Sequence, residues 1–556
     1  MPDSPPTARR GGAIELAAIV ALCLTLNLAG NGRVSLWDRD EPRYAGCTRE
    51  MIARGDWLRP TFNGVPRHDK PVLIYWLMRA GYAVGGDNPF GARLVSAVAG
   101  VLTCVGVWWL GRSMFGASVG RWSALIAATA PIMVAESKLA TTDATLCLLV
   151  VIGQAALWRL SRGESRPAAA ALWASIGLSL LTKGPIGPLL LGASMVGSWW
   201  FGGPTAWRGR LGWRWGVPLA AAIAVPWYAA IGVLTGGEFF RVAVGYHMVQ
   251  RAASSIEEHV NFPGYYPITM LLSFYPWSSL LPAAVLGAWS RRRTDPALGF
   301  LLGWAAGPLV VLEVARTKLP HYYLPSVPAC ALLAGWLVVA VSRSGIGLRG
   351  WPLGRVGLAL LIGIGVGGAG AIAAASMLVP SALAGPCLVL ALPISAGAIC
   401  GMWLFRRRET RRAVESLAGC WAVASLLFCG WILPAAEPYR LSGQVALRLE
   451  RLSAAEHASP LLASFHPPGV IYELRHPADT MASRDDLYRR VERAGKVVSA
   501  LNADELAAAR RDPRIEVEGR GEIRGFHVEK ARNLDLRLVV IRPSTRLAAA
   551  PDRLFR

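Results

Sequence analysis

Two adjacent segments set the fold class. The apolar run "AIELAAIVALCLTLNLAG" (13–30) is followed almost at once by the charged stretch "WDRDEPRYAGCTREMIARGDW" (37–57). The first has the length and composition of a helix that crosses a bilayer. The second crowds acids and arginines together, although only 17% of the chain is charged. This contrast indicates a membrane protein whose first exposed loop has a specific task.

The composition extends this reading to the whole chain. It has 556 residues, of which 53% are hydrophobic, and its mean hydropathy is +0.38. Apolar runs of about 20 residues recur from residue 12 to residue 434. The first run lacks a small-residue cleavage site, so we read it as a retained helix and not as a cleaved signal peptide. The sequence predicts an α-helical polytopic membrane protein.

The apolar segments predict about thirteen transmembrane helices, some of them short for a bilayer. They are residues 12–30, 90–111, 119–136, 143–158, 168–182, 184–202, 215–234, 264–288, 297–315, 322–342, 353–379, 382–405 and 413–434.

The distribution of arginine predicts the topology. The net charge of +22 is concentrated in short loops, at residues 9–10, 112 and 121, 159–166, 208–214, 291–293, 343–355 and 406–412. If the N-terminus is cytoplasmic, all these loops fall on the cytoplasmic side, as the positive-inside rule requires. This pattern explains the basic charge without a nucleic-acid partner. The loops on the outer side are then 31–89, 137–142, 182–184, 235–263 and 316–321, and the tail from about 435.

The tail has a different composition from the rest of the chain. The segments "PLLASF", "KVVSAL", "IEVEG" and "LRLVVIRP" predict short strands, and "SRDDLYRRVERAG" and "NADELAAARR" predict helices. We therefore expect two domains: residues 1–434, a transmembrane domain that includes the first outer loop 31–89, and residues 435–556, a small extracytoplasmic α/β domain.

Nine cysteines give no sign of a disulfide framework or a structural zinc site. Most lie within apolar runs, none follows Cys429, and no CxxC pair occurs.

Lysine is rare, and its placement points to function. The chain has six lysines: Lys70, Lys138, Lys183, Lys318, Lys496 and Lys530. The first four lie in predicted outer loops or at outer helix ends, where a compact ammonium could hold a phosphate. Chance placement of a few residues is the alternative.

Acids and other polar groups accompany these lysines. Their contexts are "RHDKP" (67–71), "ESKLATTDATL" (136–146), "LLTKGPIG" (180–187) and "RTKLPHYYLP" (316–325). Ionisable groups at the end of a span usually face a bundle interior or a water-filled cavity. We expect an outer cavity that includes Asp143; a position at the membrane interface is the alternative for Glu136, Asp143 and Glu313.

This composition of cations and carboxylates fits a phosphate-bearing lipid head group at the membrane surface. Asp40, in the first outer loop, is a candidate general base for an acceptor hydroxyl or phosphate oxygen. Asp69 could bind a divalent metal that neutralises a leaving phosphate. His259, in "EEHVNFPGYY", could be a second ligand for zinc or manganese, although a lone loop histidine is more often only solvated.

Several motifs resemble one family in order along the chain. The stretch "WDRDEPRYAGCTREMIARGDWLRPTFNGVPRHDKPVLIYWL" (37–77) resembles the first outer loop of the bacterial GT-C glycosyltransferases related to aminoarabinose transferase and protein O-mannosyltransferases. The matches continue with "ATTDATL", "LLTKGPIG", "GEFF", "HVNFPGYYPITMLLSFYPWSSLLP" and "TKLPHYYLPSVPA". The resemblance covers about residues 12–345, and the tail carries no motif of its own.

The resemblance implies a GT-C enzyme that transfers a sugar from a polyprenyl-phosphate carrier, with inversion, on the outer face of the bacterial cytoplasmic membrane. Asp40 of the Asp40–Glu41 pair matches the catalytic carboxylate, and the predicted catalytic residues are Asp40 and Glu41. Asp69 and Lys70 match an acid-Lys-Pro step implicated in metal and phosphate binding, although the acid is usually glutamate. The element "TKLPHY" matches cavity-lining residues of the family. The predicted donor-binding residues are Arg43, Lys70, Lys138, Lys183, Lys318, His321 and Tyr322.

The predicted partners are a polyprenyl-phosphate-linked sugar, an acceptor that could be lipid A, a protein or a glycan, and membrane lipids. A divalent metal (zinc, manganese or magnesium) is the expected cofactor, with no organic cofactor. For Arg43, Arg49 and Arg54 the alternative role is on the solvated side of an amphipathic helix.

Two rival functions are a lipid-linked sugar transporter or flippase, and a non-catalytic assembly subunit. A transporter would place charges along a path toward the cytoplasm, whereas the acids of the membrane half concentrate outside.

Overall fold

The computed structural model describes residues 6–38, 40–243, 262–315, 317–475, 478–481, 483–527 and 532–544. The chain forms two compact units. The helical unit comprises Met1–Gly32, Trp57–Arg59 and His68–Pro434, and the mixed unit comprises Arg33–Asp56, Pro60–Arg67 and Ala435–Arg556.

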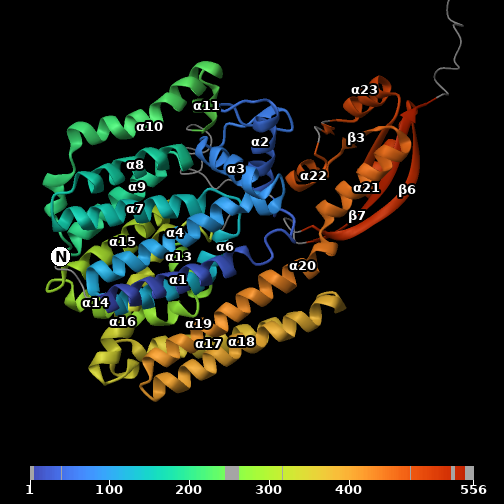
Figure 1. The fold of residues 1–556 in the computed structure, drawn as a ribbon. Coiled ribbons are helices and arrows are strands. Elements are labelled where there is room, and N and C mark those ends of the chain that lie inside the picture. The colour runs from blue at the N-terminus through green and yellow to red at the C-terminus, as the bar shows by residue number, and fades with distance from the viewer. Residues whose placement is uncertain are drawn as a thin grey trace, which may run out of the picture. The chain divides into compact units, whose positions relative to one another are not determined.

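Helices of 3 to 27 residues make up almost all of the helical unit (Figure 1). They are α1 (Pro6–Leu28), α3 (Leu73–Gly85), α4 (Pro89–Phe115), α5 (Ala117–Thr129), α6 (Pro131–Ser137), α7 (Asp143–Arg162), α8 (Arg166–Lys183), α9 (Ile186–Trp200), α10 (Trp213–Leu234), α11 (Glu238–Phe240), α13 (Tyr265–Ser273), α14 (Leu281–Arg291), α15 (Pro296–Val314), α16 (Val327–Ser344), α17 (Gly354–Ala375), α18 (Ser381–Arg406) and α19 (Thr410–Leu427).

Within the described residues, nine helices are long and apolar enough to cross a membrane, or eleven if each of two bent pairs is one span. The predicted fold class is confirmed: the chain is a multi-pass α-helical membrane protein with a small C-terminal α/β region. The count of about thirteen also included 168–182 and 184–202, which correspond to α8 and α9. Neither is among the nine, and α9 has only 15 residues.

The two bent pairs are spans that the hydropathy pattern predicted as single helices. The predicted span 119–136 is α5 followed by α6 at an angle of 63°, with Pro131 at the break. The predicted span 264–288 is α13 followed by Trp277–Arg291 at 119°, and Pro276 lies in the break. Proline lacks the N–H that a continuous helix needs. Apolar composition therefore predicts the segments but not their directions.

Small residues let neighbouring helices of this unit approach closely. A side chain at Gly303 of α15 would collide with the backbone of Gly197 and Ser198 on α9, and one at Gly197 would meet the Gly303 carbonyl at 2.7 Å. Such contacts replace the hydrophobic driving force that is missing between helices in lipid. Helix α16 lies at the centre of the unit, with 89% of its apolar window buried.

A five-stranded sheet is the centre of the mixed unit, in the order β4–β3–β5–β7–β6. Its strands are β3 (Ser459–Leu462), β4 (Asp479–Thr480), β5 (Val497–Leu501), β6 (Ile515–His527) and β7 (Arg532–Pro543), and its helices are α21 (Leu441–Glu456), α22 (Pro468–Glu473), α23 (Arg484–Ala494) and α24 (Ala503–Arg510). Strand β3 is parallel to β4 and β5, whereas β7 is antiparallel to β5 and β6. The four strands and two helices predicted in the tail are confirmed.

The first loop adds a helix and a hairpin to the mixed unit. Helix α2 (Glu41–Ala53) precedes β1 (Thr61–Phe62) and β2 (Val65–Pro66). Asn63 and Gly64 join these strands with φ of 56° and 75°, the positive values that a tight hairpin turn of Asn-Gly adopts. The sequence prediction assigned this loop to the transmembrane domain, whereas the contacts group most of it with the tail. The boundary predicted after residue 434 coincides with a unit boundary.

Polar contacts between residues about 400 positions apart join the loop to the tail. Arg440 donates to the carbonyls of Ser35 at 2.8 Å and Leu36 at 2.6 Å. Arg49 donates to the Tyr472 carbonyl at 2.7 Å, and its guanidinium lies 4.0 Å from the centre of the Tyr472 ring. The loop is therefore an integral part of the mixed unit.

Candidate functional site

Three acids stand at the start of α2, and their surroundings differ. Asp38 accepts hydrogen bonds from the Ser442 hydroxyl at 2.5 Å and from the Gly469 amide. Glu41 is 2% exposed and accepts from the Trp37 amide at 2.7 Å. Both carboxylates thus hold the loop in place.

Asp40 is the exposed member of the three. It occupies the N-cap position of α2, but its side chain makes no capping hydrogen bond. The side chain is 56% exposed, and an oxygen lies 3.9 Å from the guanidinium of Arg43. An accessible carboxylate on a well-anchored helix end can accept a proton from a substrate hydroxyl.

Asp143, at the first position of α7, is the centre of a charged cluster in the helical unit. Its Oδ1 lies 2.7 Å from the Nζ of Lys183, the last residue of α8. His321 Nε2 lies 4.0 Å from the other oxygen, and the Tyr322 ring lies 4.6 Å from the Lys183 ammonium. Lys70 interacts electrostatically with Asp143. We call these five residues the Asp143 cluster.

The Asp143 cluster gathers basic side chains in a partly buried place. Lys70, Lys183 and His321 surround Asp143, whose side chain is 10% exposed, while that of Lys183 is 15% exposed. A second buried carboxylate, Glu136, also interacts electrostatically with Lys183. A partly buried group of cations attracts an anion more strongly than exposed cations do, because water screens them less. This arrangement can hold a phosphate.

Lys318 takes part in a different set of contacts. Its ammonium lies 2.6 Å from Glu313 and donates to the Phe262 carbonyl at 3.1 Å. Glu313 in turn accepts from the amides of Gly264 at 3.3 Å and Tyr266 at 2.8 Å. The Glu313–Lys318 pair therefore fixes the start of α13.

Lys138 caps the end of α1. Its ammonium donates to the carbonyls of Leu26, Asn27 and Ala29, at 3.1, 3.2 and 2.6 Å. These bonds use all three N–H groups of the lysine. Burial lowers the pKa of Lys138 to about 8. The structure thus gives this predicted donor-binding residue a backbone-anchoring contact.

The predicted metal ligands are only partly described. Asp69 is half-buried, and His259 lies outside the described residues. Within the described ranges, no group of three His, Cys, Asp or Glu side chains is placed to hold a metal ion, so metal binding stays a prediction. His68, which no sequence pattern singled out, is buried; its Nε2 lies 3.9 Å from Glu238 of the "GEFF" motif, and its ring packs edge-on against Phe239.

Comparison with known proteins gives the family. Residues 69–229 match the family model described as dolichyl-phosphate-mannose-protein mannosyltransferase. An undecaprenyl phosphate-alpha-4-amino-4-deoxy-L-arabinose arabinosyl transferase of Pseudomonas paraeruginosa is 30% identical over 442 residues, which is 78% of this chain and 77% of the relative. This chain belongs to that transferase family. The predicted resemblance is confirmed.

Other members of the aminoarabinose transferase family match over a shorter range. A Pseudomonas aeruginosa transferase of the same name is 34% identical over 336 residues. The match covers 59% of this chain and 60% of the relative, so the chain spans about three fifths of the length of this relative and of two further transferases of Pseudomonas aeruginosa.

Solved structures confirm the fold. The apo structure of ArnT from Cupriavidus metallidurans superposes with a TM-score of 0.75 and 23% identity, over 95% of this chain and 98% of that chain. The structure of the same transferase bound to undecaprenyl phosphate gives a TM-score of 0.73. An archaeal oligosaccharyltransferase, AglB from Archaeoglobus fulgidus, gives 0.51 at 12% identity, over 90% and 71% of the two chains.

Proposed function

We propose that the chain transfers a sugar from a polyprenyl-phosphate carrier to an acceptor, with inversion, at the outer face of the bacterial cytoplasmic membrane. The Asp143 cluster is the observation that carries this proposal, because it brings Lys183 of α8 together with Lys70 and His321 from two loop segments around Asp143. In the proposed orientation the N-terminus is cytoplasmic and the C-terminal α/β region is extracytoplasmic, as the arginine distribution predicts.

The names of the relatives support the donor. They are named for undecaprenyl phosphate-linked 4-amino-4-deoxy-L-arabinose, and the transferase of Cupriavidus metallidurans was solved with undecaprenyl phosphate. We propose that this chain uses a donor of the same class. The proposed acceptors are lipid A, a protein hydroxyl or a glycan.

The roles of the residues follow from their surroundings. Lys70 and Lys183 hold the negative charge of the donor phosphate, and Asp143 keeps the Lys183 ammonium in place. Asp40 accepts the proton of the acceptor group as the acceptor oxygen attacks the anomeric carbon of the donor sugar. The bond between that carbon and the phosphate oxygen breaks on the opposite side, so the configuration inverts and polyprenyl phosphate leaves.

A divalent ion is a separate part of the proposal. Asp69 and His259 would hold zinc, manganese or magnesium, which would neutralise charge on the leaving phosphate. Elemental analysis of purified wild type and Asp69→Asn tests this part. Equal metal content in both proteins would contradict it.

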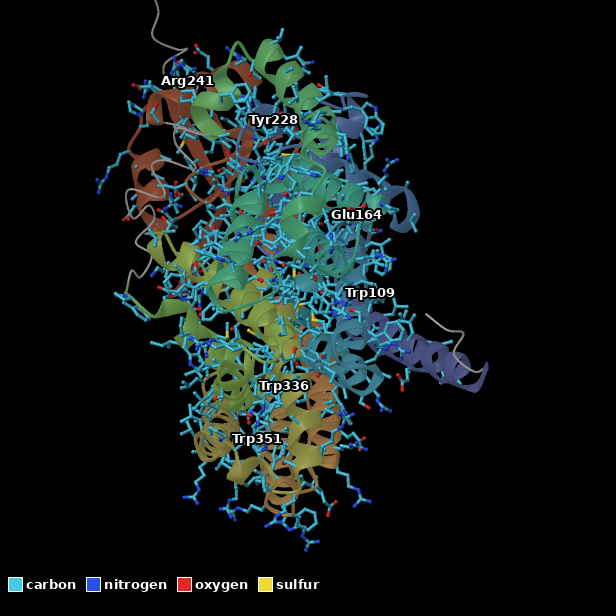
Figure 2. All side chains as sticks on the ribbon, turned by 90° about the vertical axis from the view of Figure 1, so that its left-hand side faces the viewer. Trp109, Glu164, Tyr228, Arg241, Trp336 and Trp351 are labelled. Carbon is cyan, nitrogen blue, oxygen red and sulfur yellow. The ribbon has the colours of Figure 1, made fainter. Side chains whose placement is uncertain are left out.

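Mass spectrometry of lipids that co-purify with the protein tests the donor assignment. We expect a polyprenyl-phosphate monosaccharide on wild type, and about tenfold less on Lys70→Met, because a charged hydrogen bond to phosphate is lost. Glu164→Gln is the control, since this exposed acid (Figure 2) lies in the loop between α7 and α8. Absence of polyprenyl lipid on wild type, or equal amounts on all three proteins, would contradict the assignment.

A further inference from the structure

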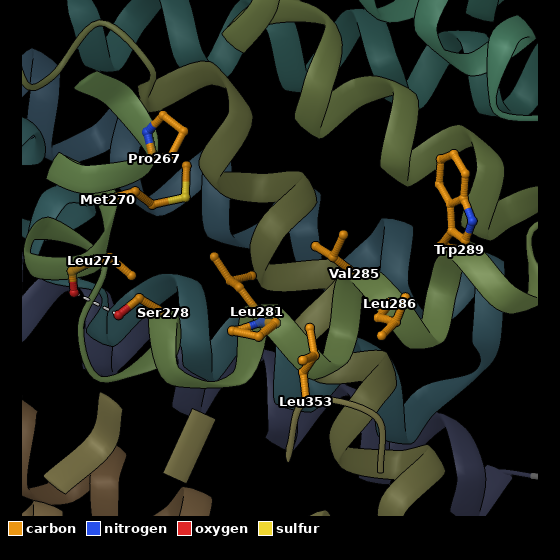
Figure 3. Close-up of a pocket in the computed structure, with 10 residues that line it drawn as sticks. Pro267, Met270, Leu271, Ser278, Leu281, Val285, Leu286, Trp289 and Leu353 are labelled. Atoms are coloured by element: carbon orange, nitrogen blue, oxygen red, sulfur yellow. Dashed lines mark hydrogen bonds between the residues drawn. The ribbon is translucent and has the colours of Figure 1, made fainter. Parts of the chain in front are cut away.

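An apolar groove runs along α14 and has a volume of about 610 Å³. Pro267 and Met270 of α13 lie at one end, and Leu281, Val285 and Trp289 follow along α14 (Figure 3). The bend of 119° between α13 and the helix that follows gives the groove its first wall.

The groove presents almost no polar group. Ser278 lines it, but its hydroxyl donates to the Leu271 carbonyl at 2.8 Å (Figure 3). Val285 and Trp289 are 43% and 42% exposed. Such side chains on a membrane-spanning segment face hydrocarbon. The groove therefore suits an alkyl chain.

Arginines stand at the Trp289 end of the groove. Arg291 ends α14, and Arg292 and Arg293 follow it. The Arg292 guanidinium lies 3.7 Å from the centre of the Trp289 ring and donates to the Trp289 carbonyl at 2.5 Å. Because a guanidinium has five N–H groups, this bond leaves others for an anion. Asp295 is the one acid nearby in sequence, and it caps α15 by accepting from the Ala297 amide at 3.1 Å.

Stacking holds the first of these arginines in place. The Arg291 guanidinium lies 4.8 Å from the centre of the Trp351 ring, and Trp351 packs edge-on against Trp336. The side chain of Arg293 is exposed. The end of the groove thus combines fixed and accessible cations.

The dimensions match one leaflet of a bilayer. Helix α14 has 11 residues, so it is about 16 Å long, close to half of the ~30 Å hydrocarbon thickness. A lipid whose chain lies along α14 would place its head group at the arginines. The sequence predicts the cytoplasm on this side.

We propose that this groove binds an anionic glycerophospholipid of the cytoplasmic leaflet, with one acyl chain along α14 and the phosphate at Arg292 and Arg293. Basic pockets beside membrane helices favour anionic head groups in this way. The proposal is independent of the transfer reaction. Arginines that only fix the topology would show no preference among lipids, whereas this proposal requires that one site prefers an anionic lipid.

Native mass spectrometry of the purified full-length protein tests the proposal. Dioleoyl phosphatidylglycerol and dioleoyl phosphatidylethanolamine have the same chains and differ in head-group charge. We expect the first bound phosphatidylglycerol to bind about 25-fold more tightly than phosphatidylethanolamine, because each of the two arginines contributes about fivefold. Arg292→Gln/Arg293→Gln removes this preference. Val285→Trp fills the groove and weakens the binding of both lipids.

A matched arginine provides the control. Arg407 is the C-cap of α18 and lies 3.9 Å from the centre of the Trp403 ring, so Arg407→Gln removes a similar stacked cation elsewhere. We expect it to leave the preference unchanged. The proposal is wrong if wild type shows no preference, if the double variant keeps it, or if Arg407→Gln reduces it equally. Displacement of phosphatidylglycerol by undecaprenyl phosphate, one for one, would assign the groove to the donor and overturn the proposal as well.

Discussion

Asp40 and Asp143 are both aspartates close to a cation, but they lie in different units and in opposite surroundings. Asp40, in the mixed unit, is 56% exposed and lies 3.9 Å from Arg43. Asp143, in the helical unit, is 10% exposed and lies 2.7 Å from Lys183. An exposed acid with a distant cation is free to exchange a proton, whereas a buried acid in a tight ion pair organises charge. We therefore assign the proton transfer to Asp40 and the organisation of the charged cluster to Asp143.

The largest effect that we expect is loss of turnover in Asp40→Asn. Removal of a general base lowers kcat by about 10²- to 10⁴-fold. The thermal unfolding temperature should stay that of wild type, because Asp40 makes no buried contact. Transfer assays in membranes that contain the polyprenyl-linked donor measure the effect, with Glu164→Gln as the control. Retained turnover would show that Asp40 is not the general base. If the protein were a transporter, the substitution should leave transport unchanged.

Lys183→Met should instead destabilise the helical unit. Asp143 would remain buried without its ammonium partner, which costs about 3–5 kcal/mol. Thermal unfolding in detergent would show a lower transition temperature than wild type. The double variant Asp143→Asn/Lys183→Met should regain much of the loss. If Lys183→Met and wild type have the same transition temperature, the ion pair between Asp143 and Lys183 does not stabilise the helical unit.

Lys138→Met tests the role of Lys138, whose described hydrogen bonds all go to backbone carbonyls. The variant loses charged hydrogen bonds to three carbonyls at the end of α1, and we expect a loss of about 1.5–3 kcal/mol. Hydrogen exchange near the end of α1 should become faster. Lys496→Met, in the mixed unit, is the control and should leave α1 unchanged. A specific loss of donor binding with intact stability would instead favour the phosphate role predicted from the sequence.

The smallest effect concerns pH and the mixed unit. A hydrogen bond from Lys496 holds the pKa of Glu456 below its ordinary value of 4.5, and Arg520 and Arg542 add to the shift. A lowered pKa in the folded state stabilises the fold above pH 4.5, and this contribution is lost as the pH falls through the folded pKa. Glu456→Gln should therefore weaken the acid dependence of hydrogen exchange in β7. An unchanged acid dependence would show that the Glu456 network does not contribute.

The sequence predicts those features that depend on local composition. Hydropathy located the spans, and alternation located the four strands of the tail, because both patterns arise from neighbouring residues. The placement of the few lysines located Lys70, Lys183 and Asp143, and the resemblance added His321 and Tyr322; the structure brings these residues together from α7, α8 and two loop segments. The bends at Pro131 and Pro276 were missed, since apolar runs continue across both positions.

Other features depend on partners distant in the chain. Nothing near Asp38 in the sequence indicates that it accepts from Ser442, and nothing near Lys138 indicates three carbonyls at the end of α1. The loop 31–89 was therefore read as part of the membrane domain, and Lys138 as a phosphate ligand. Residue type predicts that a charge needs a partner, but the fold decides which partner it has.

Reconstituted proteoliposomes that contain a radiolabelled polyprenyl-phosphate sugar test whether Asp40 is the general base of sugar transfer, with donor binding and transfer measured on the same sample. We expect Asp40→Asn to bind the donor as wild type does but to transfer its sugar at least about 100-fold more slowly. Transfer by Asp40→Asn at the wild-type rate, or wild-type protein that neither binds nor consumes the donor, would contradict this assignment.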